Sequence, residues 1–207
     1  MHIKVQQVGK RYLRSWIFRG IDLEFQGDCI YGLTGHNGSG KSTLLQILAG
    51  FLSPSEGEII FEQAGASIKR DDIHQYLSFS SPYTALIEEL TLEEHLKFHQ
   101  KLRPFIDGME VDALMDLMEL SDEWDKEVRY FSSGMKQRLK LGLSILSDSS
   151  FILLDEPGSN LDSQSIQWYL NLIQTYRRGR LMIIASNTEE DLSLCQERIS
   201  IETYKKG

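Results

Sequence analysis

The sequence predicts an α/β fold, a sheet covered by helices, with a helical lobe inserted into it. Strand-like and helix-like segments alternate along most of the chain, which is typical of sheets with helices packed on their faces. Between Pro82 and Ser147 no segment resembles a strand, whereas the flanking parts are rich in strands. We therefore expect one domain over residues 1–207, in which residues 1–81 and 149–207 form the α/β lobe and residues 82–148 a helical subdomain.

The individual elements follow from the local patterns. Short apolar runs predict strands, and longer segments with apolar residues at helical spacing predict helices. The expected strands are Ile3–Val8, Ile21–Phe25, Cys29–Thr34, Gly57–Phe61, Tyr76–Phe79, Phe151–Asp155, Leu181–Ala185 and Arg198–Ile201. The expected helices are Lys41–Leu48, Leu92–Leu102, Val111–Leu120, Ser133–Leu146 and Ser163–Tyr176.

The helix expected from Leu92 has a clear start signal. Thr91 and Glu94 have the Thr-x-x-Glu spacing of a capping box, in which each side chain binds the other residue's backbone N–H. His95 and His99 are spaced to chelate a metal from one helix face, but position 96 lacks the Glu of a His-Glu-x-x-His motif. We interpret both histidines as partly buried residues of the helix face, with a metal site as the alternative.

Composition and charge narrow the classes of partner. The chain has 207 residues, 41% of them apolar and 25% charged, so it can bury a sizeable core without disulfides or metals. Its formal net charge is −8, whereas nucleic acids are bound through clustered Lys and Arg, so we expect no nucleic-acid partner. The longest apolar run, Leu181–Ala185, is far shorter than the roughly 20 residues of a membrane helix. We therefore expect neither a membrane span nor a signal peptide.

Two cysteines, Cys29 and Cys195, lie in apolar contexts far apart in the sequence. We interpret them as buried free thiols, with a disulfide between them as the alternative. Free thiols are typical of a reducing compartment, so a cytoplasmic location is expected.

Residues 35–42 fit the phosphate-binding pattern Gly-x-x-x-x-Gly-Lys-[Ser/Thr]. The glycines let the backbone bend so that its N–H groups converge on phosphate oxygens, and the helix that begins near Lys41 adds the positive end of its dipole. Lys41 is expected to reach the β- and γ-phosphates, and the Ser42 hydroxyl to bind Mg²⁺. A Gly-rich turn without a ligand is the alternative. The expected nucleotide-binding residues of this segment are Gly35, His36, Asn37, Gly38, Ser39, Gly40, Lys41, Ser42 and Thr43.

A second motif places two carboxylates directly at the end of an apolar strand, in the segment Phe151–Glu156. An acid at the carboxyl end of a parallel strand suits a metal position at the edge of the sheet. We expect Asp155 to hold Mg²⁺ together with Ser42, and Glu156 to polarise a water for in-line attack on the γ-phosphate. Alone, this pair would be weak evidence for a metal site, because Asp-Glu pairs are common on protein surfaces. In a chain that also has a phosphate loop, the pair is strong evidence.

With these motifs the chain resembles the ATP-binding subunits of ATP-binding-cassette (ABC) transporters, from about residue 2 to about residue 203. Tyr12 lies where that family places an aromatic that stacks on adenine, with Trp16 as a rival. Residues 131–135, Phe-Ser-Ser-Gly-Met, lie where the family has Leu-Ser-Gly-Gly-Gln, so Ser132 and Gly134 are expected to bind the γ-phosphate held by a second subunit. The alternative for Ser132 is an ordinary helix N-cap. Asp162 matches the residue that, in the family, helps to couple the two sites of a dimer.

The resemblance implies a P-loop NTPase core of the ABC type, with a mostly parallel sheet, N-terminal antiparallel strands and an inserted helical subdomain. It also implies an ATPase that forms an ATP-dependent homodimer, or a heterodimer with a related ATPase, around two Mg-ATP. Such a subunit is cytoplasmic and lies at the inner face of the cell membrane through a separate transmembrane permease. The apolar cluster of Tyr83, Leu86 and Ile87 would be the place that receives the permease, with ordinary core as the alternative.

Two positions depart from the family pattern. A Gln expected after the strand that enters the helical lobe is missing from the stretch Tyr76–Pro82, where a serine lies near its place. A late His, expected to act at the γ-phosphate, is replaced by Asn187. We count Asn187 as a candidate catalytic residue with Lys41 and Glu156. Alternatively, Asn187 caps a following helix, with Glu190 completing a capping box. In that case Ser186 is the next candidate for the residue that acts at the γ-phosphate.

These departures leave two rival functions open beside the transporter subunit. One is a nucleotide-gated binding module with little turnover. The other is a soluble ABC ATPase that acts on DNA or ribosomes, although such proteins usually have long coiled coils, two cassettes or basic extensions that do not occur in this sequence.

Overall fold

The computed structural model describes residues 1–204. These residues form two compact units. The first contains Met1–Phe79, Ser149–Glu156 and the chain from Arg178, and the second contains Ser80–Asp148 and Pro157–Arg177. The division differs from the expected one at Ser80 and Ser81 and in the segment Pro157–Arg177, all of which belong to the helical unit.

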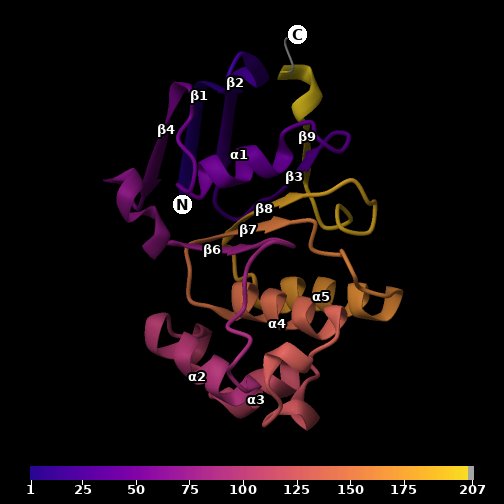
Figure 1. Ribbon diagram of the computed structural model, residues 1–207. Helices are drawn as coiled ribbons and strands as arrows, with labels where there is room; N and C mark the ends of the chain where they lie inside the picture. The colour runs from indigo at the N-terminus through magenta and orange to yellow at the C-terminus, as the bar shows by residue number, and fades with distance from the viewer. Residues whose placement is uncertain (205–207) are drawn as a thin grey trace. The chain divides into compact units, whose positions relative to one another are not determined.

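The first unit contains an antiparallel sheet with the strand order β2-β1-β4-β5 (Figure 1). Its strands are β1 (His2–Tyr12), β2 (Ser15–Gln26), β4 (Glu56–Gln63) and β5 (Ala66–Ile68). Strand β1 pairs with both β2 and β4, and its buried side chains include Ile3, Val5 and Val8. The short β5, which has no apolar run, was not predicted from the sequence.

A second sheet in the same unit has the strand order β6-β7-β8-β3-β9. Its strands are β3 (Ile30–Thr34), β6 (Leu77–Ser80), β7 (Phe151–Asp155), β8 (Leu181–Ala185) and β9 (Glu197–Ser200). Strand β8 is parallel to both β7 and β3, and β3 is parallel to β9. The carboxyl ends of these four strands therefore lie along one edge of the sheet.

Helix α1 (Lys41–Leu48) follows β3 and lies between the two sheets (Figure 1). Its apolar side chains, with inward-facing side chains of both sheets, form the main core of this unit. The fully buried members from α1 are Leu44, Leu45, Ile47 and Leu48. Burying the helix on both sides fixes its first turn at the edge of the parallel sheet.

The helical unit contains α2 (Leu92–Leu102), α3 (Val111–Leu117), α4 (Ser133–Leu146) and α5 (Ser163–Tyr176). Short 3₁₀ turns cover Arg70–Gln75 in the first unit, Ile106–Gly108, Ser121–Glu123 and Val128–Tyr130 in the helical unit, and Ile201–Tyr204 in the first unit. The capping box at α2 is confirmed, since Thr91 Oγ1 accepts from Glu94 N–H and Glu94 Oε2 accepts from Thr91 N–H.

Helix α5 packs against α4 within the helical unit, which explains why Pro157–Arg177 groups with it. Arg138 Nη2 donates to Ser165 Oγ at 2.9 Å, and Trp168 Nε1 donates to the Leu117 carbonyl at 2.7 Å. Gln137, which is buried, donates to the carbonyl of Pro157 at 2.8 Å. These contacts join residues far apart in the sequence, so the local sequence patterns that predict helices and strands could not predict them.

Three further expectations can be compared with the structure. The two cysteines are free, but each is half-buried rather than fully buried. The core interpretation of the apolar cluster is wrong for Tyr83, which is 91% exposed, and for Ile87, which is also exposed, whereas Leu86 is half-buried. Among residues 1–204, no helix has both the length and the apolar character needed to cross a bilayer.

Candidate active site

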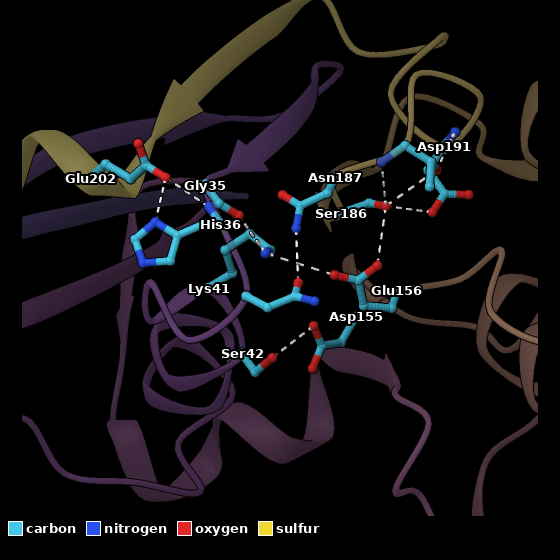
Figure 2. Close-up of polar contacts among 12 residues, drawn as sticks. Gly35, His36, Lys41, Ser42, Asp155, Glu156, Ser186, Asn187, Asp191 and Glu202 are labelled. Atoms are coloured by element: carbon cyan, nitrogen blue, oxygen red, sulfur yellow. Dashed lines mark hydrogen bonds and ion pairs between the residues drawn. The ribbon is translucent and has the colours of Figure 1, made fainter.

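The candidate site lies at the carboxyl edge of the parallel sheet, where three neighbouring strands end. In the pairing register Asp155 of β7 is opposite Ala185 of β8, and Ala185 is opposite Leu33 of β3. The residues that follow these strands are therefore brought side by side although they are far apart in the sequence. They are the phosphate loop after β3, Glu156 after β7, and Ser186 and Asn187 after β8 (Figure 2).

The phosphate loop needs glycine where it meets β2. Gly40 has a φ of 109°, and a Cβ there would come within 2.7 Å of Ile17 Cγ2 and 2.8 Å of Phe18 Cδ1. Gly40 is followed at once by Lys41, the first residue of α1, with Ser42 and Thr43 in the same turn. The loop therefore presents the N-terminus of α1 at the sheet edge, which is an arrangement suited to phosphate.

Lys41 lies at the centre of the site. Its side chain is only 6% exposed, and Nζ donates to the Gly35 carbonyl at 2.7 Å and lies 3.7 Å from Glu156 Oε1 (Figure 2). A buried ammonium group is stable only beside such partners. The lysine thus holds one positive charge between the phosphate loop and the carboxylate that follows β7.

Ser42 and Asp155 form a pair of oxygen groups. Ser42 Oγ donates to Asp155 Oδ1 at 3.0 Å (Figure 2). Burial raises the pKa of Asp155, although the hydrogen bond from Ser42 and the charge of Lys41 oppose the rise. No group of three or more His, Cys, Asp or Glu residues suited to a metal occurs within residues 1–204. One hydroxyl and one carboxylate nevertheless fit Mg²⁺, which in nucleotide sites takes one or two protein oxygens and completes its shell with phosphates and waters.

Glu156 is held in a left-handed backbone conformation, with a φ of 47°, directly after β7. Its N–H donates to the Ala185 carbonyl at 2.8 Å, and its Oε2 lies 3.3 Å from Ser186 Oγ. Burial raises the pKa of Glu156, whereas Lys41 and the hydrogen bond from Ser186 lower it. A partly exposed carboxylate of raised basicity is a suitable proton acceptor for a water.

Asn187 contacts the phosphate loop. Its Nδ2 donates to Asn37 Oδ1 at 3.0 Å (Figure 2). The alternative that Asn187 caps a helix is wrong, because residues 188–196 form turns and no helix. Instead, the side chain of the next residue makes a hydrogen bond with the spacing of a helix cap: Thr188 Oγ1 accepts from Asp191 N–H at 3.4 Å.

A contact that the sequence did not predict links the phosphate loop to the end of the described chain. Glu202 Oε1 accepts from the His36 backbone N–H at 2.7 Å and lies 2.6 Å from His36 Nδ1 (Figure 2). The pair is 166 positions apart, and no spacing signal could have found it.

The structure distinguishes the two aromatic candidates for stacking on a base. The guanidinium groups of Arg11 and Arg19 lie 5.6 Å and 4.7 Å from the Trp16 ring centroid. Arg19 is fixed there by its ion pair with Glu56 at 2.7 Å. Tyr12, at the end of β1, is 49% exposed, and Lys10 Nζ lies 5.2 Å from its ring centroid. Tyr12 is therefore the more available of the two aromatic rings.

The remaining predicted residues lie in the helical unit. Ser132 is the N-cap of α4, and its Oγ accepts from Met135 N–H at 3.2 Å, with Gly134 in the first turn. The cap interpretation of Ser132 is therefore correct, and it leaves room for a second role at the same helix end. In the segment without the expected Gln, the Ser80 hydroxyl is buried and has no hydrogen-bond partner among the described residues, and Ser81 Oγ lies 3.1 Å from Thr84 Oγ1.

Comparison with known proteins gives the family. The family model described as ABC transporter matches residues 18–159, more than half of the chain. Curated relatives include the human phospholipid-transporting ATPase ABCA7, 28% identical over 204 residues, and the mouse ATP-binding cassette sub-family A member 17, 30% identical over 174 residues. These alignments cover 96% and 82% of this chain, but the chain spans only about a tenth of the length of either relative.

Solved structures share the fold. A putative ABC transporter ATP-binding protein from Pyrococcus furiosus superposes with a TM-score of 0.83 at 22% identity, over all of both chains. A dimeric structure of the ATP-binding cassette MJ0796, in a post-hydrolysis state bound to ADP and Pi, superposes with a TM-score of 0.82 at 19% identity, over 96% of this chain and 93% of that one. Together with the phosphate loop and the carboxylates after β7, the family match establishes that the chain belongs to the ABC transporter family, as an ATP-binding, ATPase-type domain.

Proposed function

We propose that this chain binds Mg-ATP in the site described above and hydrolyses it to drive a separate membrane permease. The observation that supports this best is the convergence of Lys41, Ser42, Asp155 and Glu156 from α1 and β7 on one edge of the sheet. Each supplies a different part of phosphoryl-transfer chemistry, which depends on positioning and electrostatic stabilisation.

The roles follow from the chemistry of the groups. The loop N–H groups and Lys41 Nζ bind the β- and γ-phosphates and stabilise the charge that develops on them. Ser42 and Asp155 would hold Mg²⁺, which would neutralise part of the phosphate charge. Glu156 orients a water and accepts its proton as the water attacks in line. Tyr12 stacks on the adenine, and Asn187 supports the phosphate loop through Asn37.

We propose further that two such domains close around two ATP molecules. Ser132 and Gly134 lie at the N-terminus of α4, where backbone N–H groups and the helix dipole favour an anion. They would complete the site of a second copy or of a related ATPase, so closure depends on the γ-phosphate. The dimeric form of the MJ0796 cassette supports this arrangement by likeness of fold.

The location of the complex follows from the proposed partner. The permease would hold the domain at the inner face of the cell membrane, and the exposed Tyr83 and Ile87 offer an apolar surface for that contact. Co-purification of the tagged chain with an integral membrane protein from detergent-solubilised membranes tests this part. Recovery of the chain without such a partner, but with ribosomes or DNA, would favour a soluble ABC ATPase instead.

Two variants test the ATPase assignment itself. Lys41→Ala should weaken ATP binding about 10–150-fold in calorimetry, because a charge-assisted contact contributes ~1.5–3 kcal/mol. Glu156→Gln should keep ATP affinity, lose phosphate release, and elute in gel filtration as a dimer only with Mg-ATP.

The exposed Lys101, near the end of α2, provides a matched control, since Lys101→Ala should change neither binding nor turnover. Undiminished ATP binding by Lys41→Ala would show that the phosphate-loop assignment is wrong. A Glu156→Gln protein that stays monomeric with and without Mg-ATP would contradict the dimer mechanism.

A further inference from the structure

A buried serine and a buried aspartate lie directly behind the proposed general base. Ser186 is the first residue after β8 and is 0% exposed, and Asp191, in the turn that follows, is 1% exposed. Ser186 Oγ lies 2.6 Å from Asp191 Oδ2 and 3.3 Å from Glu156 Oε2 (Figure 2). The serine hydroxyl thus bridges a carboxylate in the interior and the carboxylate at the site.

The position of the hydroxyl is fixed from several sides. Its oxygen accepts from the Thr188 backbone N–H at 3.3 Å, and the Ser186 backbone N–H donates to the Leu33 carbonyl of β3 at 3.2 Å. Asp155 of β7 is paired with Ala185 of β8. The residues that directly follow these two strands, Glu156 and Ser186, therefore lie next to each other at the sheet edge. The backbone therefore sets the separation of the two side chains, and Asp191 sets the orientation of the hydroxyl.

A hydroxyl has a single proton, so it can donate to only one carboxylate at a time. Asp191 Oδ2 is the nearer acceptor by 0.7 Å, as the distances of 2.6 and 3.3 Å show. The shorter bond is the stronger one, so Asp191 keeps the Ser186 side chain in the rotamer that places its hydroxyl beside Glu156. From that position the hydroxyl donates to Glu156 Oε2 in alternation with Asp191 Oδ2, while Glu156 Oε1 faces Lys41 at 3.7 Å.

We propose that Ser186 and Asp191 are positioning residues for ATP hydrolysis, which hold the Glu156 carboxylate in the orientation that accepts a proton from the attacking water. This inference rests on the proposed role of Glu156 as general base. It assigns to the pair no contact with nucleotide, metal or water. Supporting groups of this kind fix the geometry of a reacting side chain, and a small misplacement of that side chain costs rate rather than binding.

The test is steady-state ATP hydrolysis by Asp191→Asn, which keeps the volume of the side chain, and by Ser186→Ala. Each should lower kcat about five- to tenfold, the effect of losing one orienting hydrogen bond, and leave KM for ATP within about twofold. ATP binding measured by calorimetry should be unchanged. Equal losses in kcat and in ATP affinity would overturn the proposal, because the pair would then act on the nucleotide or on the whole fold.

A matched control separates positioning from folding of the turn. Ser193→Ala removes a hydroxyl of the same turn, which donates to the Glu190 carbonyl at 2.7 Å, and leaves the Ser186 link between Asp191 and Glu156 in place. We expect it to lower the melting temperature while kcat stays within about twofold. If Ser193→Ala lowers kcat as much as Asp191→Asn does, the segment is merely structural and the proposal is wrong.

A double-mutant cycle distinguishes this inference from the proposed function. In a Glu156→Gln background, Asp191→Asn should cause no further loss of the residual turnover, since the pair acts through Glu156. If Glu156→Gln itself hydrolyses ATP normally, the general-base assignment fails. If Glu156→Gln is inactive but Asp191→Asn and Ser186→Ala are fully active, only the positioning role fails.

Discussion

Ser42 Oγ donates a hydrogen bond of 3.0 Å to Asp155 Oδ1, which joins the first turn of α1 to the last residue of β7 across 113 positions of sequence. The contact places a hydroxyl and a buried carboxylate on the same side of the phosphate loop. Since burial raises the pKa of Asp155, a cation beside it would favour the ionised form. The relationship thus predicts which protein oxygens govern the magnesium requirement.

Asp155→Asn should abolish magnesium-stimulated hydrolysis while leaving metal-free ATP binding nearly intact. An amide keeps the shape of the side chain but removes the charge that holds the cation, and even an outer-shell partner of a metal is worth about 10–100-fold, so a loss of at least about 100-fold in rate is expected. A magnesium titration of phosphate release, with calorimetry in EDTA, checks both parts. Asp122→Asn, at an exposed position in the helical unit, serves as control, and an unaltered magnesium response in Asp155→Asn would refute the assignment.

Tyr12→Ala should weaken ATP binding, whereas Trp16→Ala should not. Tyr12 is 49% exposed, while the guanidinium groups of Arg11 and Arg19 lie 5.6 Å and 4.7 Å from the Trp16 ring centroid. Stacking of a base on an aromatic ring contributes ~1–3 kcal/mol, so the affinity should fall about 5- to 150-fold for Tyr12→Ala and little for Tyr12→Phe. Calorimetry with ATP and with inorganic triphosphate checks the prediction, because only ATP binding should depend on Tyr12. The reverse order of the two alanine variants would identify Trp16 as the stacking residue.

His99 should make the helical unit less stable in mild acid. Burial lowers the pKa of His99 to about 4, with smaller contributions from His95 and Arg103. Its Nε2 lies 2.7 Å from Ser147 Oγ, and its ring stacks on Phe105. Since the ordinary pKa is near 6.5, the unfolded chain binds more protons between pH 6.5 and 4, so stability falls as the pH is lowered through that window.

Urea unfolding at pH 7.5 and pH 5.0 measures this effect. His99→Gln, which cannot take up a proton, should lose less stability than the parent on going to pH 5.0. The neighbouring His95, whose pKa is also lowered by burial, should account for part of the remaining loss. If parent and variant lose stability equally, His99 does not titrate as its burial implies.

Much of the fold could be predicted because local signals and tertiary structure agree. Helices α1, α2, α4 and α5 have the expected bounds, since each begins at a capping residue or at the end of a glycine-rich loop and carries a continuous apolar face. The convergence of Lys41, Ser42, Asp155 and Glu156 was also predictable, because a phosphate loop and an acid-terminated strand both end at the carboxyl edge of a parallel sheet.

Contacts made by loop residues could not be predicted in the same way. The pairing of His36 with Glu202 and of Ser186 with Asp191 depends on how turns fold after β9 and β8, and the residue types alone fit an ordinary polar surface. The capping alternative for Asn187 failed for a related reason. Its spacing to Glu190 suits a helix, but residues 188–196 turn back toward β9, and Thr188 takes the hydrogen bond instead.

Asn187 should limit the rate of hydrolysis. Its amide donates to Asn37 Oδ1 at 3.0 Å, so the side chain lies beside the phosphate loop. A histidine at this position could also donate a hydrogen bond, but it could in addition become positively charged as charge develops on the γ-phosphate. Exchanging a neutral contact for a charge-assisted one is worth ~1–2 kcal/mol, or about 5- to 30-fold in rate.

We therefore expect slow hydrolysis by the parent domain and a several-fold higher kcat for Asn187→His at saturating ATP. Asn37→Ala is the informative control, because it removes the partner of Asn187 without adding charge and should not raise kcat. If Asn187→His and the parent have equal kcat while the melting temperature drops, the amide serves only to tether the phosphate loop. In that case the missing positive charge does not limit the reaction, and the weak-turnover alternative loses its physical basis at this position.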